Sequence, residues 1–541
     1  MLYSDSTHLT NFGTDSCWPL GLFMGNQSKY DRAKPSLNPM HHVAYIPSMP
    51  DTIQDMYMQN YGKPVTAAVL AHCKRELMQA VIRLVLDEHT KRLTANNVAS
   101  ILASSAIQLI IQRTSIKTLA KYPCPRCHVK KTHISEIGNK RDMWRRHNGK
   151  RLDDSLRRTN VEIAHKIIFE SGVPVNSKRV NIILNDASFT PTHNAFSEHL
   201  SQYGMNYFNI FLVDLLHEFE LGVWKSVFSH LMRILYAKGG NVIQILNERF
   251  HAIPTFGRDT ICKFHRNVSA MKKLAARDWE DLLQCMMPVC EGLLPEPHNS
   301  MVLDLVYTLA TWHARAKMRM HMESSLDHLE ATTTLLGKEL CRFQKKTCAA
   351  YNTKELPQEE AARGRRHAAM VQKNTLQGVA PPKALKGAKR KEFNMNTPKI
   401  HLLGHYAEII REFGMSDNYT TQHGELGHHA LKDRYPQTNK HHFLLQLAKI
   451  EARKRAIRML IKRRCKVMQE ANKNLRVAHK KGKAQQRLHG AESKAKRDPA
   501  AHYHIAKNSK ESCDITGWLS EHEGDAALKD FYVLLQDHLL A

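Results

Sequence analysis

Apolar residues are spaced differently in the first fifty residues and in the rest of the chain. Up to about Pro50, short apolar runs are broken by Gly, Pro, Asn and Ser, which predicts strands and turns. Over residues 65–89 the apolar positions recur every three to four residues, which predicts an amphipathic helix. A similar pattern over residues 97–120 predicts a second helix, which ends at the Tyr122-Pro-Cys-Pro stretch.

The centre of the chain carries one strand-like run followed by helical patterns. The run Asn206-Tyr-Phe-Asn-Ile-Phe-Leu-Val213 is mostly apolar and directly precedes Asp214, which predicts a strand. A helix is expected over residues 223–237, ending at Gly239-Gly240. Further helical patterns predict an all-helical block, at residues 242–250, 271–293, 301–318 and 322–344.

The composition changes in the last third of the chain. Residues 354–398 mix many Lys and Arg with Pro, Gly and Ala, which is typical of a flexible basic linker. Order is expected to resume at Pro398, and a long helix from about residue 443 continues into a basic segment. Residues 526–540 predict an amphipathic C-terminal helix.

The overall composition is that of a folded protein with several structural units. The chain has 541 residues, of which 42% are hydrophobic and 24% charged. No apolar run reaches the roughly 18 residues of a membrane-spanning helix, and the first residues lack the pattern of a secretory signal, so we expect no membrane partner. The 79 Lys and Arg outnumber 51 Asp and Glu, giving a formal net charge of +28. Such a charge favours a polyanionic partner, and nucleic acid is the leading one.

The densest positive charge lies in residues 451–500, which contain 17 Lys or Arg against 4 acids. A solvated basic helix is the ordinary interpretation. The functional one is salt-dependent, sequence-tolerant contact with the phosphates of double-stranded DNA. The residues predicted to make this contact are Lys454, Arg455, Lys462, Arg463, Arg464, Lys480 and Lys481. The segment could also serve as a nuclear-import signal.

One cysteine pair has the spacing of a zinc knuckle. Cys124 and Cys127 are separated by two residues, so that one turn can present both thiolates to a tetrahedral ion. We predict a structural zinc ion on Cys124, Cys127 and His133; the alternative is two reduced thiols in a turn. Other candidates for the missing ligands are His128, His147, Cys73 and Cys262. The remaining cysteines are expected to be reduced.

Three acids occur in contexts suited to divalent metal ions. Asp5 lies where a short strand gives way to a polar turn, Asp214 follows the predicted strand, and Glu425 lies on the first turn of a predicted helix. Transfer of DNA strands uses two such ions, about 3.5–4 Å apart, held by carboxylates. Each acid also has an ordinary interpretation: a solvated acid for Asp5, a helix N-cap for Asp214, and an acid favoured by the helix dipole for Glu425.

Three sequence blocks carry a resemblance to a known family. The most specific block comprises Phe196-Ser-Glu-His-Leu200 and Asn209-Ile-Phe-Leu-Val-Asp-Leu-Leu-His-Glu-Phe-Glu-Leu-Gly-Val-Trp-Lys225. An earlier block comprises Trp18-Pro and Gly25-Asn-Gln-Ser-Lys-Tyr-Asp-Arg-Ala-Lys-Pro-Ser36, and a later one runs from Thr421-Gln-His-Gly-Glu-Leu-Gly-His-His429 to Thr438-Asn-Lys440. In this order they resemble Plavaka-type transposases, fungal members of the CACTA (En/Spm) superfamily.

The resemblance implies a fold and a set of site residues. It implies an α/β RNase H-like catalytic core with large α-helical insertions, predominantly helical overall. Asp5, Asp214 and Glu425 would be a catalytic triad that binds two Mg²⁺ or Mn²⁺ ions. His217 and His423 lie beside these acids in the sequence and could contact a phosphate or orient a carboxylate, although ordinary packed or surface histidines are the more frequent case. The family also carries a Cys-x-x-Cys pair between its first two aspartates.

With this core in mind, the chain is expected to consist of nine segments. They are core strands with the first aspartate (1–65), a helical segment (66–120), a zinc knuckle (121–160), a core strand and helix with the second aspartate (161–240), a helical insertion domain (241–353), a basic flexible linker (354–398), a return to the core with the glutamate (399–450), a basic helical segment (451–510) and a C-terminal amphipathic helix (511–541).

Three functional hypotheses remain at this stage. The first is a nuclear, metal-dependent transposase that cleaves and joins DNA strands and could act as a homo-oligomer. The alternative is a catalytically inactive, transposon-derived protein that binds DNA or chromatin. The third is a helical scaffold protein whose positive charge is incidental. Members of the family usually carry a long region before the first aspartate, whereas only four residues precede Asp5 here. We therefore expect a short strand at Asp5 and no end-recognition module, as in a decayed element or an incomplete gene model.

Overall fold

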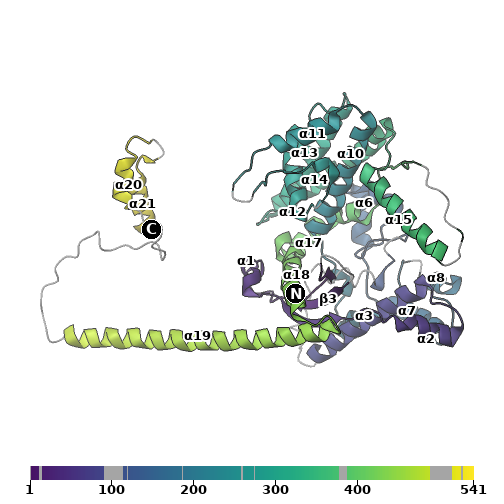
Figure 1. Cartoon of the computed structure of the whole chain (residues 1–541), viewed down its shortest axis with the longest axis horizontal. Helices are drawn as coiled ribbons and strands as arrows, with labels where there is room; N and C mark the ends of the chain where they lie inside the picture. Colours follow the sequence, from purple (N-terminus) through teal and green to yellow (C-terminus); the bar gives the residue numbers. More distant parts are fainter. Residues whose placement is uncertain are drawn as a thin grey trace. The chain divides into compact units, whose positions relative to one another are not determined.

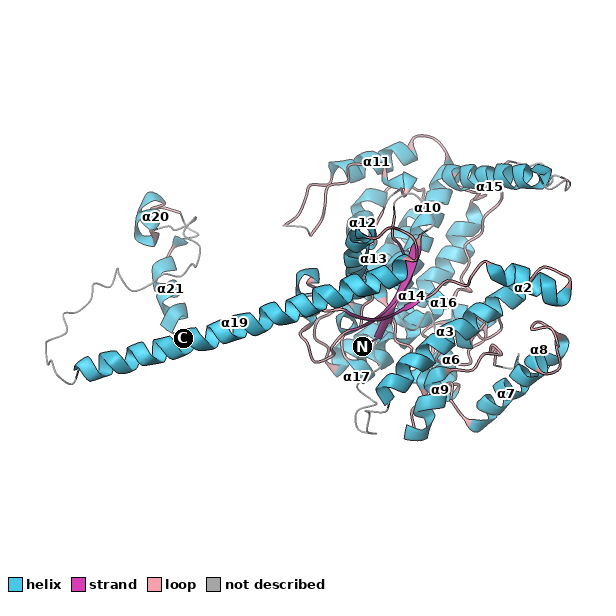
Figure 2. Cartoon of the chain, turned by 60° about the horizontal axis from the view of Figure 1, so that its bottom comes forward, coloured by secondary structure: helices cyan, strands magenta, loops and turns pink. Residues whose placement is uncertain are grey.

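The computed structural model describes most of the chain, and the described residues form two compact units. The described residues are 2–10, 15–90, 114–117, 120–184, 187–257, 260–272, 274–376, 380, 387–487, 514–525 and 528–540. The first unit is Met1–Arg453 and the second is Lys454–Ala541. Figure 1 shows the course of the chain, and Figure 2 shows that helices dominate it.

A small antiparallel sheet opens the first unit, as the first fifty residues predicted. Its strands are β1 (Leu2–Ser4), β2 (Thr7–His8), β3 (Ser16–Leu22) and β4 (His41–Ile46). The central strand β3 pairs with all three others, with Leu2 opposite Leu22 and Trp18 opposite Ile46. The short helices α1 (Lys29–Arg32), η1 (Pro35–Leu37) and α2 (Thr52–Tyr61) flank β4 in the sequence.

Several helices between residues 67 and 210 share a hydrophobic core with this sheet. The predicted helix at 65–89 is confirmed as α3 (Ala67–Thr90), and its Ile82 and Leu86 share a core with Leu20 of β3 and Ile46 of β4. The predicted helix at 97–120 lies chiefly outside the described residues. The other elements here are η2 (Lys131–Glu136), α6 (Lys140–Asn148), α7 (Ser155–Phe169), α8 (Lys178–Leu184), α9 (Ala195–Leu200), η3 (Ser201–Tyr203) and η4 (Tyr207–Ile210).

The strand predicted over residues 206–213 is wrong, because these residues form a 3₁₀ turn followed by extended chain. The Asn206 side chain accepts a hydrogen bond from the backbone N–H of Phe208 and so caps the turn η4. The carbonyl of Phe211, which would pair with a neighbouring strand, instead accepts a hydrogen bond from the Arg126 guanidinium at 2.9 Å. Tyr207, Phe208 and Phe211 are buried against one another, so the apolar run reflects full burial and not sheet pairing.

The predicted all-helical block is present and contains the largest hydrophobic core. The block begins after Asp214 with a π-helix, η5 (Leu215–Trp224), which continues into α10 (Lys225–Lys238). The four further helical patterns are confirmed as α11 (Val242–Ala252), α12 (Ala276–Cys290), α13 (His298–Ala316) and α14 (Glu323–Arg342), which continues into the π-helix η7 (Phe343–Cys348). Trp224, Trp279 and Trp312 are fully buried in this core, and the short turn η6 (Val268–Ala270) lies in the α11–α12 connection.

The segment 354–398, predicted as a flexible basic linker, is partly helical among its described residues. It contains the helix α15 (Pro357–Leu376), which begins at a proline and has Glu359 and Glu360 in its first turn. Glu359 pairs with Arg233 of α10 at 2.7 Å, which attaches the helix to the block. Its alanines favour a helix more than its positive charges oppose one.

The chain then passes through short helices to one long one. These are α16 (Pro398–Leu402), η8 (Leu403–His405), α17 (Tyr406–Phe413), η9 (Ser416–Asn418), α18 (Gln422–Arg434) and η10 (Tyr435–Gln437). The predicted long helix is α19 (Phe443–Arg487), 45 residues long. In the second unit, α20 (Ile515–Glu521) precedes α21 (Phe531–Leu540), so the C-terminal helix begins later than the predicted residue 526.

The protein is predominantly helical, with four short strands among the described residues. The RNase H-like arrangement of the core stays a prediction. In the described part of the chain, no helix combines the length and the low charge needed to cross a membrane.

Candidate acidic site and metal centre

Asp214 is buried at the start of the π-helix η5, where its side chain has several partners. The helix forms because Asp214 caps it: its Oδ2 accepts a hydrogen bond from the backbone N–H of His217. The same oxygen lies 2.7 Å from Nδ1 of His217 and 2.5 Å from Oγ1 of Thr421, while Oδ1 accepts a bond from the Thr421 N–H at 3.3 Å. The N-cap interpretation of Asp214 is therefore correct, and the carboxylate also contacts the segment that precedes α18.

His217 connects Asp214 to the predicted glutamate. Its Nδ1 contacts Asp214, and its Nε2 lies 3.5 Å from Oε1 of Glu425. Glu425 lies on the first turn of α18, as predicted, and its side chain is 41% exposed. Residues 214 and 425, far apart in sequence, thus lie on the two sides of one imidazole ring.

Asp5 belongs to the same neighbourhood. It follows β1 directly, as expected, and lines the same cavity as Glu425 and His428. The His428 side chain hydrogen-bonds to the backbone of Asp5, which ties the end of β1 to α18. The neighbouring Tyr3 ring packs against α18 as well, 5.6 Å from the His428 ring.

The charges of the acids shift the pKa values of His217 and Glu425. Burial alone lowers the pKa of His217, but its hydrogen bond to Asp214 and the charges of Asp214, Glu425 and Asp5 outweigh it, and the pKa lies above its ordinary value. Burial also raises the pKa of Glu425, and the charges of Asp214 and Asp5 raise it further, against the effect of His217. The acids therefore favour the protonated form of His217, which lies between Asp214 and Glu425.

A buried carboxyl group, that of Glu218, is hydrogen-bonded to the backbone of Asp214. Oε2 of Glu218 accepts hydrogen bonds from the backbone N–H of Asp214 at 3.1 Å and from the Tyr406 hydroxyl at 3.3 Å. Burial, followed by the charge of Asp214, raises the pKa of Glu218 well above its ordinary value, which favours the neutral carboxyl. The sequence analysis did not select Glu218, although it lies four residues after Asp214 on the same helix.

His423 lies in a different environment from His217. It lines a small cavity with Arg32 and Arg434, and burial together with the charge of Arg32 lowers its pKa. The structure thus brings His217, and not His423, between the acids.

A second cluster contains two cysteines and two histidines. Cys124, Cys127, His401 and His405 are all buried, and their ligand atoms lie within 4.8 Å of one another. Sγ of Cys127 is 3.2 Å from Nε2 of His401 and 3.6 Å from Nε2 of His405; Sγ of Cys124 is 3.5 Å from Nε2 of His405. The two histidine Nε2 atoms are 3.3 Å apart.

These separations fit a tetrahedral zinc ion. Bonds of about 2.3 Å to sulfur and about 2.0–2.1 Å to nitrogen place neighbouring ligands roughly 3.3–3.8 Å apart. Burial by itself raises the pKa of Cys124, but its hydrogen bond with Cys127 and the charges of His401 and His405 bring it well below its usual value, which favours the metal-binding thiolate. Oε2 of Glu408 lies 3.7 Å from Nδ1 of His405, on the side where metal-bound histidines commonly meet a carboxylate. The cluster could therefore bind zinc.

The predicted third ligand, His133, is not part of this cluster. Its Nδ1 lies 2.8 Å from Oε1 of Glu136, and His128 contacts Arg151 instead. The ligands that join the cysteine pair come from α16 and η8, far along the chain. The four-residue spacing of His401 and His405, which places two side chains on one helical face, was the sequence signal that could have identified them.

The residues predicted to contact DNA lie on α19. Arg455, Lys462, Arg463 and Arg464 are exposed, Lys454 is half-buried, and Lys480 and Lys481 lie on the same helix. Their position suits phosphate contacts, and their role stays a prediction.

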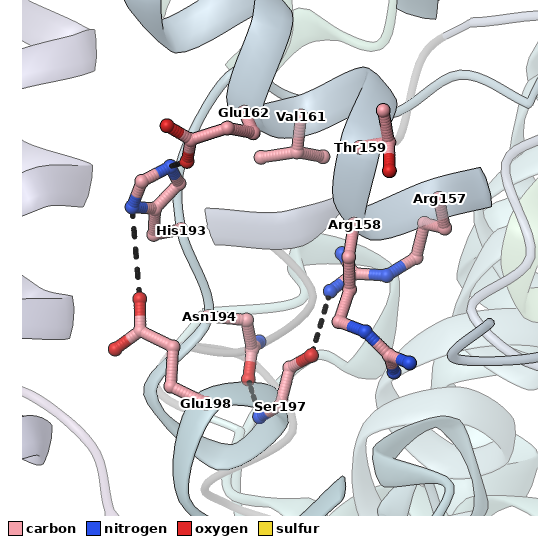
Figure 3. Close-up of a pocket in the computed structure, with 9 residues that line it drawn as sticks. All are labelled: Arg157, Arg158, Thr159, Val161, Glu162, His193, Asn194, Ser197 and Glu198. Atoms are coloured by element: carbon pink, nitrogen blue, oxygen red, sulfur yellow. Dashed lines mark hydrogen bonds and ion pairs between the residues drawn. The ribbon is translucent and has the colours of Figure 1, made fainter. Parts of the chain in front are cut away.

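A separate cavity of about 390 Å³ lies between α7 and α9 (Figure 3). Its polar groups largely satisfy one another: Arg157 donates to the Ser197 hydroxyl at 3.0 Å, and His193 lies between Glu162 and Glu198. Arg157 also pairs with Asp153 at 2.9 Å. These contacts explain how α7 and α9 are held together.

Comparison with known proteins identifies one family. Residues 1–233 match the model of the family described as Plavaka transposase, so this part of the chain is transposase-like. The match includes Asp5, Asp214, His217 and both cysteines of the metal cluster, and it ends before Glu425. No curated protein and no solved structure matches the chain.

Proposed function

We propose that this protein is a DDE-type transposase that cleaves and joins DNA strands, and that its core is RNase H-like. Asp5, Asp214 and Glu425 would hold two Mg²⁺ or Mn²⁺ ions. Such ions, when bound, make the attacking oxygen nucleophilic and stabilise the leaving oxygen. The family match over residues 1–233 supports a transposase-like activity, while the catalytic residues and the ions are our inference.

The observation that carries the proposal is the bridge formed by His217. Its two ring nitrogens contact Asp214 at 2.7 Å and Glu425 at 3.5 Å, and the charge of Asp5 acts on the same ring. Acids from three distant segments thus act on one imidazole ring, and carboxylate oxygens are ligands that suit Mg²⁺ and Mn²⁺. His217 would orient Asp214 and Glu425, and Thr421 would fix the rotamer of Asp214.

The other expected properties follow as parts of the proposal. Double-stranded DNA would be the substrate, with contacts from α19, and the protein would act in the nucleus as a homo-oligomer. The Cys124, Cys127, His401 and His405 cluster would hold a structural zinc ion. It would connect the cysteine turn to the chain that leads into α18, which carries Glu425.

The test compares DNA nicking by the wild-type protein and by isosteric variants. Mg²⁺- or Mn²⁺-dependent nicking of duplex DNA is expected from the wild type, with a loss of at least about a hundredfold in Asp214→Asn and in Glu425→Gln. The control is Asp433→Asn, which alters an exposed acid on the same helix as Glu425. Equal nicking by all four proteins would refute the proposed site. Salt-sensitive DNA binding with no metal-dependent nicking would favour the alternative, an inactive DNA-binding protein.

A further inference from the structure

Asp5 and Glu425 lie in the wall of a large cavity. It measures about 860 Å³ and is formed by the start of η5, by α12 with the residue before it, by the residues that follow α13, and by α18. Figure 1 shows α12 and α18 within the first unit, and residues of both helices line the cavity. The lining therefore combines Asp5 and Glu425 with residues of the helical block.

The charges that line this cavity divide into paired and available ones. Lys317 is neutralised by Glu280, whose Oε1 lies 2.5 Å from its Nζ. Asp281 is buried, and its Oδ2 accepts a hydrogen bond from the backbone N–H of Cys262. The other two acids are Asp5 and Glu425, which belong to the proposed metal site.

Three exposed cations remain in the lining: Arg277 on α12, Arg319 after α13, and Lys432 on α18. None of them forms an ion pair within the described residues. These three cations thus line the cavity without an ion pair to its acids, so their charge is available to an anionic partner from outside the chain.

We propose that Arg277, Arg319 and Lys432 bind the phosphates of duplex DNA on both sides of the bond that is cleaved. This inference rests on the proposed function and extends it, because the helical block would itself bind the DNA substrate. A guanidinium or ammonium group gains from a phosphate partner and releases condensed counterions from the DNA. The cations would bind the flanking backbone while the acids and their metal ions act on the scissile phosphate.

The chemistry of the lining also specifies the mode of recognition. The described residues that line the cavity include no Phe, Tyr or Trp, so we expect no contribution from aromatic stacking on unpaired bases. Contacts from Arg and Lys to phosphates carry no sequence information. The cavity should therefore hold double-stranded DNA next to the cleavage site with little preference for its sequence.

The first experiment measures DNA binding in Ca²⁺ buffer, without any requirement for cleavage. The triple variant Arg277→Ala, Arg319→Ala, Lys432→Ala is compared with a matched triple at exposed residues outside the cavity: Arg141→Ala, Lys178→Ala, Arg179→Ala. The slope of log K against log salt should fall by about 3 in the cavity variant, with at least about tenfold weaker binding at roughly 0.1 M salt. An equal, small effect of both triples would overturn the proposal.

A second measurement covers the case in which the cavity variant folds poorly. Benzoylphenylalanine replaces Gln284, an exposed residue of α12 in the cavity lining, or Tyr307, an exposed residue of α13 outside it. Irradiation with duplex DNA should crosslink the protein through position 284 and not through 307. Crosslinking at both positions or at neither would contradict the proposal that this cavity binds DNA. These binding results do not depend on nicking, so loss of the cavity effect and loss of metal-dependent nicking are separate outcomes.

Discussion

Nε2 of His401 lies 3.2 Å from Sγ of Cys127, although the two residues are 274 positions apart in the sequence. This contact joins the turn at Cys124 and Cys127 to α16, and α16 packs against η5, which begins at Asp214. A metal ion at the cluster would therefore stabilise the part of the fold that holds the second aspartate.

Removal of zinc should destabilise the protein. We expect about one zinc per chain in the purified protein. Chelation or Cys127→Ser should lower the melting temperature by at least about 5 °C, because the ligands come together only in the folded chain and zinc binding therefore adds to the free energy of folding. The measurements are metal content by atomic emission and thermal unfolding followed by circular dichroism. Cys465→Ser, at an exposed cysteine, is the control and should retain both the metal and the melting temperature. A metal-free protein that melts like the wild type would contradict the assignment.

Gly424→Ala should be destabilising even though alanine is the better helix former. A Cβ atom at position 424 would lie 1.9 Å from Cε2 of Tyr3, so the strand that precedes Asp5 and the helix that carries Glu425 could not approach as they do. The expected loss is about 1–3 kcal/mol in the free energy of unfolding, measured by urea titration. Gly364→Ala on α15 meets no atom within 4 Å and should instead stabilise by about 0.5–1 kcal/mol. Effects of the same sign at both positions would show that Tyr3 does not pack as described.

Glu218 should tolerate glutamine and not alanine. Its Oε2 accepts two hydrogen bonds, from the Asp214 N–H and the Tyr406 hydroxyl, and burial favours the neutral carboxyl. Glu218→Gln keeps an acceptor oxygen and should change the free energy of unfolding by less than about 1 kcal/mol. Glu218→Ala leaves a cavity and two buried donors without a partner, and should cost about 2–4 kcal/mol. Equal losses in the two variants would mean that the negative charge itself is needed.

Stability should fall on mild acidification because of His230. This residue is 1% exposed, its ring nitrogens have no partner within the described residues, and it packs beside Phe343 and Phe393. Burial lowers the pKa of His230 to about 4, from an ordinary value of 6.5. Between these two pH values the unfolded chain binds the proton and the folded one does not, so folding is fully favourable above pH 6.5 and is weakened as the pH falls towards 4.

The size of this effect follows from the shift, which corresponds to about 3 kcal/mol at most. Urea unfolding at several pH values should show that His230→Leu has a smaller loss of stability between neutral and acidic pH than the wild type. His251→Leu, at an exposed histidine on α11, should leave the wild-type pH dependence unchanged. If His230→Leu and His251→Leu follow the same pH profile as the wild type, His230 is not the cause.

The helical block was predictable because its helices are amphipathic and lie in contact with one shared core. Apolar spacing therefore located α11 to α14 within a few residues. The same reasoning failed at residues 206–213, where an apolar run is buried on all sides and periodicity cannot distinguish a strand from a turn. At α15, charge and glycine suggested a linker, although the alanines and the contact of Glu359 with Arg233 produce a helix.

The candidate sites were predictable only in part, for a physical reason. Asp214 and Glu425 are ordinary helix-start acids by local sequence, and only their resemblance to a family selected them. His401 and His405 become ligands through tertiary packing, which no local pattern around Cys124 reveals. Likewise the cavity between α12 and α18 depends on how two distant helices meet, so Arg277 and Arg319 could not be distinguished from other surface arginines.

The packing of Tyr3 against Gly424 also has a consequence for biosynthesis. Ribosomes add about 5–20 residues per second, so β1 emerges roughly 20–80 s before α18 can cover it. During that interval the first strand needs protection, from its hairpin partners or from a chaperone. A nascent protein cannot bring Asp5 and Glu425 together until α18 has been synthesised, so a product that terminates before α18 would lack the proposed site.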